Sequence, residues 1–229
     1  MAGSLVGVGL YSIKEAARLL QADSRELRRW IFGYTSTDRA GERRSHPNVS
    51  GNAPYLRELG ALTFFELLEA RLIKGLRGHK VSLQSIRSAV AEAQRIFHDP
   101  HPFVLKRIES DGRSIFAKAA AETDDEPLLD LLKRQYVFDK IVRQSLLFGV
   151  DFEAGRAARW FPTTTQAIVI DPARAFGKPI VARDGVPTET LYAAFLAEGG
   201  DVARVSRIYQ VPAADVSRAV RFEKSLGPN

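Results

Sequence analysis

The chain has 229 residues, of which 45% are hydrophobic and 26% are charged, a balance typical of a globular protein with a sizeable core. It contains no cysteine, which excludes disulfides, thiolate metal sites and cysteine nucleophiles and suits a cytoplasmic protein. No run of 18 apolar residues occurs, so we expect no membrane-spanning helix. The first ten residues lack the basic start of a signal peptide, and we expect a leader without regular structure there.

The charge is unevenly distributed along the chain. The net charge is +6 and the sequence pI is about 9.7, which favours anionic partners. Residues 1–100 hold 15 Lys and Arg against 10 Asp and Glu, whereas the positive and negative residues of the remainder almost balance. The basic excess therefore points to nucleic-acid binding by the N-terminal part.

Two short helices are predicted at the start of the basic region. Ser12 and Glu15 have the spacing of a capping box, and residues 13–20 carry apolar side chains at helical intervals. Gln21-Ala22 is a short connection, and Asp23 is a good cap for a second helix. This pattern predicts a helix-turn-helix.

The second helix has two chemically different faces. Leu27, Trp30 and Ile31 share one face, while three arginines lie on the opposite face: Arg25, Arg28 and Arg29. A recognition helix in a DNA major groove has an apolar back and a cationic front of this kind. The alternative is an ordinary amphipathic helix whose arginines are only solvated.

A polar segment from Gly33 to Leu59 follows, rich in breakers and basic residues. We expect short strands around Tyr34-Thr35 and Tyr55-Leu56 with a basic loop between them, forming a wing, that is, a β-hairpin beside the helix-turn-helix. The candidate DNA-contacting residues of this segment are Tyr34, Arg39, Arg43, Arg44 and His46. A surface loop without function is the alternative.

Two further helices are predicted after the wing. The first begins at the capping box Thr63-Phe64-Phe65-Glu66, and the second is capped by Ser82. With these helices, residues 11–97 resemble the DNA-binding domain of MerR-like regulators. The resemblance rests on Tyr11-Ser12-Ile13-Lys14-Glu15-Ala16-Ala17 and on Gly78-His79-Lys80-Val81-Ser82-Leu83-Gln84-Ser85-Ile86-Arg87.

The middle of the chain is predicted to be a connector that contains a β-hairpin. Asp111-Gly112, between Phe103–Ser110 and Arg113–Lys118, is a strong hairpin signal. His98-Asp99-Pro100-His101 holds three potential zinc ligands. Pro100 and the neighbouring Pro102 favour an extended turn, so we expect no metal site.

The C-terminal part is predicted to hold two short strands, at 168–170 and 179–182, and then three helices. Thr188 is expected to cap the first of these helices and Asp201 the second. Residues 168–226 resemble a small helix-turn-helix domain widespread in toxin–antitoxin operons. The matching pieces are Ile170-Asp171-Pro172, Phe176-Gly177-Lys178-Pro179-Ile180-Val181, Gly185-Val186-Pro187-Thr188, and the helix Val202–Tyr209 before Val211-Pro212.

Two roles stay open for this second helix-turn-helix. It could contact DNA through its arginines, Arg204, Arg207, Arg218 and Arg221, or it could form a dimer interface. The local net charge is near zero, which favours dimerisation.

The predicted fold class is mainly α, in three parts: a MerR-like winged helix-turn-helix domain over 10–98, a β-containing connector over 99–161, and a three-helix helix-turn-helix domain over 162–229. This combination resembles the larger VapB-type antitoxins. The resemblance implies a cytoplasmic antitoxin that represses its own operon by binding double-stranded DNA. It also implies a PIN-type ribonuclease toxin as partner, and a homodimer would fit a palindromic operator.

The main alternative is a MerR-like, ligand-responsive transcription regulator without a toxin partner. No nucleophile with a neighbouring base is recognisable in the sequence, so we predict no enzyme activity, no catalytic residue, no cofactor and no metal.

Overall fold

The computed structural model describes residues 7–38, 41–49 and 54–227. They form two compact units. Among the described residues, the N-terminal unit comprises those of Tyr11–Phe148 with Phe152–Ala157. The C-terminal unit comprises 7–10, Gly149–Asp151 and 158–227. The predicted mainly α class is confirmed. The three-part division of the chain stays a prediction.

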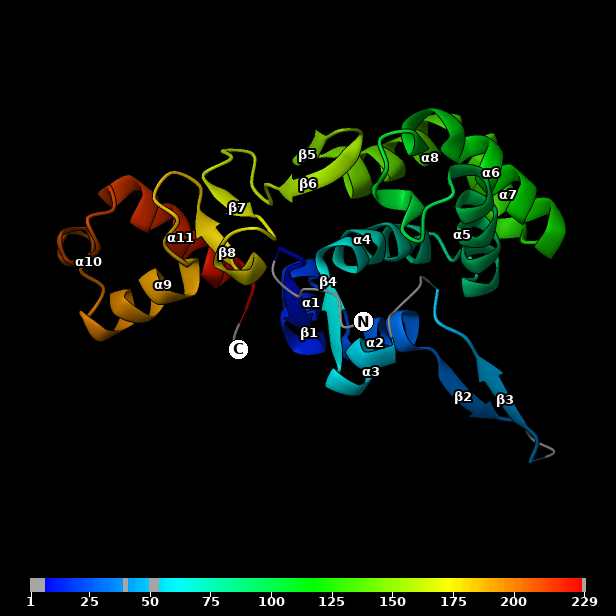
Figure 1. Ribbon diagram of the computed structural model, residues 1–229, viewed down its shortest axis with the longest axis horizontal. Helices are drawn as coiled ribbons and strands as arrows, with labels where there is room; N and C mark the ends of the chain where they lie inside the picture. The colour runs from blue at the N-terminus through cyan, green and yellow to red at the C-terminus, as the bar shows by residue number, and fades with distance from the viewer. Residues whose placement is uncertain (1–6, 39–40, 50–53, 228–229) are drawn as a thin grey trace. The chain divides into compact units, whose positions relative to one another are not determined.

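Eight α-helices are described in the N-terminal unit (Figure 1). They are α1 (Ile13–Leu20), α2 (Ser24–Phe32), α3 (Pro54–Leu59), α4 (Phe64–Gly78), α5 (Leu83–Phe97), α6 (Ile108–Thr123), α7 (Glu126–Lys133) and α8 (Gln135–Val142). A 3-10 turn, η1 (Pro102–Val104), precedes α6, and a π-helical segment, η2 (Arg143–Leu147), continues α8. Two pairs of short strands complete the unit: β1 (Leu10–Ser12) with β4 (Ala61–Thr63), and the antiparallel pair of β2 (Tyr34–Thr37) with β3 (Arg43–His46).

Local capping explains where several of these helices begin. Ser12 and Thr63 each accept a hydrogen bond from the backbone three residues on, and Glu15 and Glu66 return one, so both predicted capping boxes are present. Asp23 caps α2 and Ser82 caps α5, as predicted.

The core of this unit is built around α4. The side chains of Phe64, Leu67 and Leu72 are at most 1% exposed, and the back of α2 contributes Leu27 and Ile31, which are fully buried. A second group of buried rings joins η1, α6 and α8: Phe103 stacks on Phe116 at 5.7 Å, and Phe116 meets Phe138 edge-on at 5.4 Å. These contacts hold the helix-turn-helix and the later helices in one body.

The predicted hairpin at Asp111-Gly112 is wrong, because both residues lie inside α6. Ile108, Ile115, Phe116 and Ala119 recur at helical spacing and are all buried. Burial of this stripe outweighs the turn preference of Asp-Gly, and Asp111 lies in the first turn, where a helix favours negative charge. The connector does contain a β-hairpin, but at β5 (Val150–Glu153) and β6 (Arg156–Trp160), with Ala154-Gly155 as its turn.

The expected strand at Tyr55-Leu56 is also wrong, because these residues belong to α3. The wing is instead closed by β3, much nearer in sequence to β2. The short separation lowers the cost of closing the loop between the two strands.

The C-terminal unit holds the predicted strands and three helices. In the sheet of order β5-β6-β7-β8, β7 (Ile168–Ile170) pairs antiparallel with β8 (Pro179–Val181). The helices are α9 (Thr188–Ala197), α10 (Val202–Tyr209) and α11 (Ala213–Ser225), and Asp201 caps α10 as expected. Thr188 is not the cap of α9. It is the first residue of that helix, and its hydroxyl donates to the Glu223 carboxylate and the Pro179 carbonyl.

Candidate nucleic-acid interface

The three arginines predicted to contact DNA lie together on the exposed face of α2. Leu27, Trp30 and Ile31 are 0–3% exposed on the opposite side of the same helix. Arg25, Arg28 and Arg29 are all exposed. The tertiary fold therefore turns the cationic side of this short, rigid helix outward.

Aromatic rings position two of these arginines. The Arg28 guanidinium lies 5.5 Å from the ring centre of Phe32, and that of Arg29 lies 5.4 Å from the ring centre of Tyr34. Arg25 has no side-chain partner within the ranges that the structure describes. Rings thus hold the charges of Arg28 and Arg29 in place, and no carboxylate among the described residues pairs with them.

The wing is an antiparallel hairpin whose register is fully paired. Tyr34 lies opposite His46, and Ser36 lies opposite Arg44. These four side chains share one face, because side chains alternate along a strand. The imidazole of His46 stacks on the Tyr34 ring and is 2.9 Å from the Ser36 hydroxyl. Arg29, Tyr34 and His46 therefore form a continuous stack from α2 into the wing.

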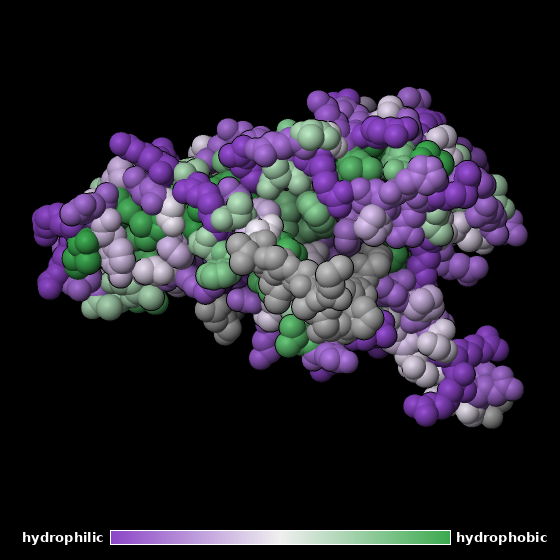
Figure 2. Space-filling view, in the orientation of Figure 1, coloured by the Kyte–Doolittle hydropathy of each residue, from purple (hydrophilic) through white to green (hydrophobic). Residues whose placement is uncertain are grey.

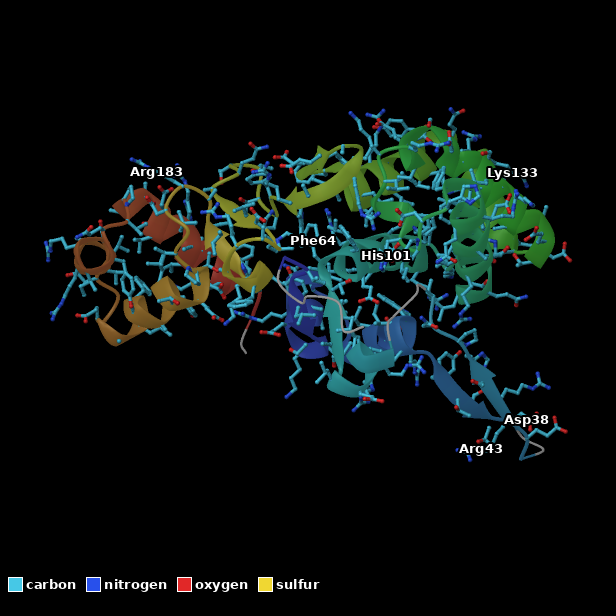
Figure 3. All side chains as sticks on the ribbon, in the orientation of Figure 1. Asp38, Arg43, Phe64, His101, Lys133 and Arg183 are labelled. Carbon is cyan, nitrogen blue, oxygen red and sulfur yellow. The ribbon has the colours of Figure 1, made fainter. Side chains whose placement is uncertain are left out.

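Arg43 and Arg44, two further wing candidates, lie toward the tip of the hairpin. Figure 3 places Asp38 and Arg43 there, and Figure 2 shows hydrophilic side chains over this end. Arg43 and Arg44 are exposed, and Arg44 makes a loose ion pair with Asp38 at 3.7 Å. Arg39 lies outside the described residues. A salt bridge this exposed contributes little to stability, so it leaves Arg44 able to bind another anion.

The base of the wing is fixed to α2 by its backbone. The Val49 amide donates to the Trp30 carbonyl at 2.8 Å. Gly33 has a φ of +70°, and a Cβ at this position would lie 2.4 Å from the His46 carbonyl oxygen. Only glycine permits this close approach. The backbone around Gly33 and Val49 therefore sets the angle at which the wing leaves α2.

Two further arginines support this surface and were not predicted from the sequence. Arg57 of α3 donates a hydrogen bond to the Phe32 carbonyl at the end of α2, and Arg87 of α5 donates to the Pro47 carbonyl at 2.9 Å. Burial lowers the pKa of Arg87, an effect that the charge of nearby Tyr34 opposes. No local pattern marks these residues, because their partners lie 25 and 40 positions away.

The His98–His101 segment forms a structural junction. The His101 Nδ1 lies 3.1 Å from Oε2 of Glu69, a fully buried residue of α4, while Asp99 pairs with Arg156. Burial by itself would lower the pKa of His101, but the hydrogen bond and charge of Glu69 outweigh it and the pKa is raised. Within the described residues, no three potential ligands gather as a metal site would require.

Two family models match the chain. Residues 9–90 match a family described as "Putative DNA-binding HTH domain", and residues 168–222 match a "Protein of unknown function (DUF433)". The first match spans both helices of the helix-turn-helix, the wing, α3, α4 and half of α5. No helix of the described part is both long and apolar enough to cross a membrane.

Similar proteins are found by sequence and by structure. The chain is 28% identical over 200 residues to "Putative antitoxin VapB45" of Mycobacterium tuberculosis, covering 78% of this chain and 79% of that protein. Its fold matches the crystal structure of Rv2018 from Mycobacterium tuberculosis with a TM-score of 0.64 and 22% identity, over 94% of this chain and 99% of that one. The chain is therefore a homologue of a VapB-type antitoxin with an N-terminal helix-turn-helix domain, and the resemblance inferred from its motifs is confirmed.

Proposed function

We propose that this protein is a DNA-binding antitoxin that represses its own operon and neutralises a PIN-type ribonuclease toxin. The DNA-binding part is supported by the helix-turn-helix match and by the relationship to an antitoxin. The toxin class and the autorepression rest on the resemblance to VapB-type antitoxins. The proposed activity is binding rather than catalysis, and operon repression would take place in the cytoplasm.

The observation that carries the DNA-binding half is the outward arginine face of α2. This helix has nine residues and is about 13 Å long, comparable with the ~12 Å width of the major groove. Arg25, Arg28 and Arg29 would meet phosphates or guanine edges there. Tyr34, Arg43, Arg44 and His46 of the wing, with Arg39, would contact the adjoining backbone.

A homodimer on a palindromic operator would extend this arrangement. Two copies of α2 separated by one DNA turn, about 34 Å, would enter successive major grooves. The C-terminal helix-turn-helix is the proposed dimer contact. α9 supports this role, because it is apolar in composition while Leu196 stays 59% exposed.

The DNA half is tested by titrating the full chain with its own promoter at several salt concentrations. Arg25, Arg28 and Arg29 are changed together to glutamate. The control changes three exposed residues in the same way: Lys133 of α7, Lys140 of α8 and Arg134 between these helices. We expect loss of binding only in the α2 variant. Each phosphate contact should contribute about 0.9 to the slope of log K against log salt. Equal affinity of the two variants would contradict the proposal.

The toxin half is tested separately by co-expression with the neighbouring open reading frame. We expect a stable complex in which ribonuclease activity is suppressed, and we expect the α2 triple variant to keep it. Failure to bind a PIN-type neighbour would remove the antitoxin half and leave DNA binding intact.

A further inference from the structure

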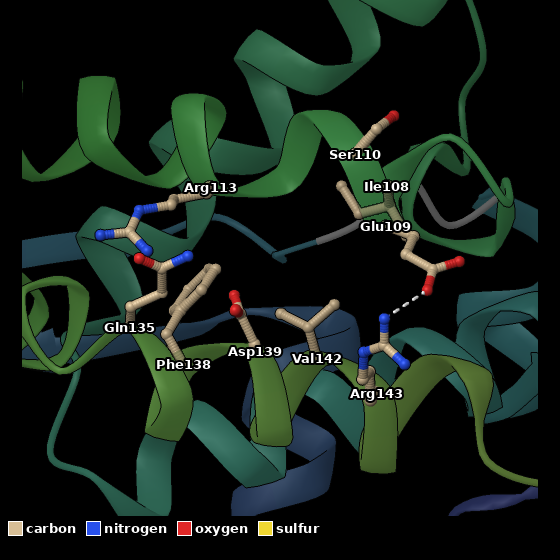
Figure 4. A pocket seen from close by; sticks show the side chains of 9 residues that line it. All are labelled: Ile108, Glu109, Ser110, Arg113, Gln135, Phe138, Asp139, Val142 and Arg143. Carbon is tan, nitrogen blue, oxygen red and sulfur yellow. Dashed lines mark ion pairs between the residues drawn. The ribbon is translucent and has the colours of Figure 1, made fainter.

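Two hollows in the protein surface differ in how their charges are balanced. The first, between α6 and α8, is lined by two arginines and two carboxylates, and Arg143 of η2 lies 3.0 Å from Glu109 of α6 (Figure 4). The second measures about 270 Å³ and lies in the C-terminal unit, between α11 and the segment 163–168. Two arginines line this second hollow, and no carboxylate of the described residues does. The second hollow therefore favours an anion.

The polar side chains of this second hollow come from two segments. Arg218 and Arg221 lie one turn apart on α11, and Thr163 and Thr165 belong to the loop before β7, with their hydroxyls 3.3 Å apart. A third hydroxyl, that of Ser225, already donates to a carbonyl of its own helix. The apolar residues that line the hollow are at most 6% exposed, so a ligand would be held by the arginines and threonines.

The charge of Arg221 is not neutralised by the protein. Arg221 is exposed and makes no ion pair within the described residues, whereas Nη1 of Arg218 lies 2.5 Å from the Asp215 carboxylate. The other carboxylates of the last three helices and their turns are engaged elsewhere: Glu189 with Lys178, Glu198 with Arg204, Glu223 with Thr188, and Asp201 as the cap of α10. The near-zero net charge of this part of the chain thus leaves the Arg221 guanidinium without a counter-charge.

The size of the hollow and its donors suit a phosphate group rather than a whole nucleotide. Sites for drug-sized ligands typically measure ~300–1,000 Å³, and the buried apolar floor offers little surface on which a base could stack. Arginine and threonine side chains are among the usual contacts to the DNA backbone. α11 is also the second helix of a helix-turn-helix, which lies against DNA in proteins that bind through this motif.

We propose that this hollow binds a phosphodiester group of duplex DNA, with Arg221 as the charged donor and Thr163 and Thr165 as neutral donors. Phosphates are the same at every base step, so the contact would add affinity without reading sequence. This inference rests on the proposed DNA-binding function and adds a backbone contact from the C-terminal unit to those of α2 and the wing. It is compatible with a dimer contact through α9, which contributes no residue to the hollow.

Arg221→Gln tests the charged contact in the full chain. Wild type and variant are titrated with the promoter and with an unrelated duplex over a roughly fourfold range of salt concentration. Loss of one phosphate contact should reduce the slope of log K against log salt by about 0.9 for each chain on the DNA. The affinity ratio of wild type to variant should therefore fall about 3.5-fold per chain across this range, equally for both duplexes.

Thr165→Val tests the neutral contact, because it removes a hydroxyl and no charge. It should weaken binding roughly two- to twelvefold while the salt slope stays unchanged. Arg183→Gln and Arg143→Gln are controls for the loss of one positive charge, since both residues are exposed and lie outside this hollow. Both should keep the wild-type slope. Arg221 has no described partner to lose, so its variant should fold.

Three results would overturn the inference. The first is wild-type affinity and slope in Arg221→Gln, and the second is a loss confined to the promoter duplex, which would indicate a base contact. The third is saturable calorimetric binding of AMP that Arg221→Gln abolishes without changing DNA affinity, which would indicate a site for a small phosphorylated molecule. In each case, loss of promoter binding in the α2 triple variant would still support the proposed function. Failure of the wild type to bind any duplex would remove both.

Discussion

The ring of Tyr34 stacks on the imidazole of His46, with ring centres 4.3 Å apart and 14° between the planes. Tyr34 and His46 lie directly opposite each other in the paired strands of the wing. The guanidinium of Arg29 from α2 lies over the Tyr34 ring. One stack thus joins the recognition helix to the hairpin. The stack therefore adds a side-chain contact between α2 and the wing to the backbone contacts at Gly33 and Val49.

Tyr34→Ala should weaken operator binding while leaving the fold intact. Loss of an aromatic pair costs about 0.5–1.5 kcal/mol, which corresponds to a roughly two- to twelvefold loss of affinity if the wing contacts DNA. Fluorescence anisotropy with labelled promoter DNA measures the effect. Thr35→Ala is the control, because Thr35 lies on the opposite face of β2. Equal losses in both variants would argue against the stack.

Gly75→Ala should destabilise the protein although alanine favours helices. An added Cβ would lie 2.8 Å from the Ser145 hydroxyl and 3.0 Å from Cγ2 of Ile141. Overpacking costs about 1–3 kcal/mol, whereas the helix-propensity gain is at most ~1 kcal/mol. Urea unfolding should show a net loss, partly restored by Ser145→Ala. Gly78→Ala, at the end of the same helix with open space around it, should be neutral or stabilising.

Asp125→Ala should lower the free energy of unfolding by roughly 2–4 kcal/mol. Asp125 is 6% exposed, caps α7 through the Leu128 amide and accepts from the Ser82 amide and the Ser85 hydroxyl. Burial raises its pKa, but these hydrogen bonds outweigh burial and lower it overall. Its stabilisation is therefore present above the pKa of the unfolded chain and is lost as pH falls through the folded pKa. The free energies of unfolding of wild type and variant should converge as the pH falls into the acid range. A difference between them that does not change with pH would contradict this account.

Wild-type stability should decline with rising pH in the range where His101 titrates. The pKa of His101 is raised in the folded chain, so its contribution is complete below the unfolded value of about 6.5 and is lost as pH rises through the folded pKa. One proton limits the slope to about 1.4 kcal/mol per pH unit. Urea unfolding of wild type and His101→Gln across this range measures the difference. The same slope of unfolding free energy against pH in both proteins would show that another group is responsible.

Local chemistry made much of the chain predictable from its sequence. Ser12 with Glu15, Thr63 with Glu66, and the caps Asp23 and Ser82 act over three residues, so their helices begin where the pattern indicates. The amphipathic spacing of α2 likewise placed its arginines opposite a buried face. Motif matches to known families added the relationship to VapB-type antitoxins.

Contacts between distant residues decided the rest. The strand of Tyr34 pairs with that of His46, twelve residues further along the chain. Asp111-Gly112 lies in a helix because the core buries Ile108, Ile115 and Phe116. Sequence alone determined the helix-turn-helix and its cationic face, because capping and helical periodicity are local. Tertiary structure decided the wing and the helix over Asp111-Gly112, because burial energy is gained only when separate segments meet.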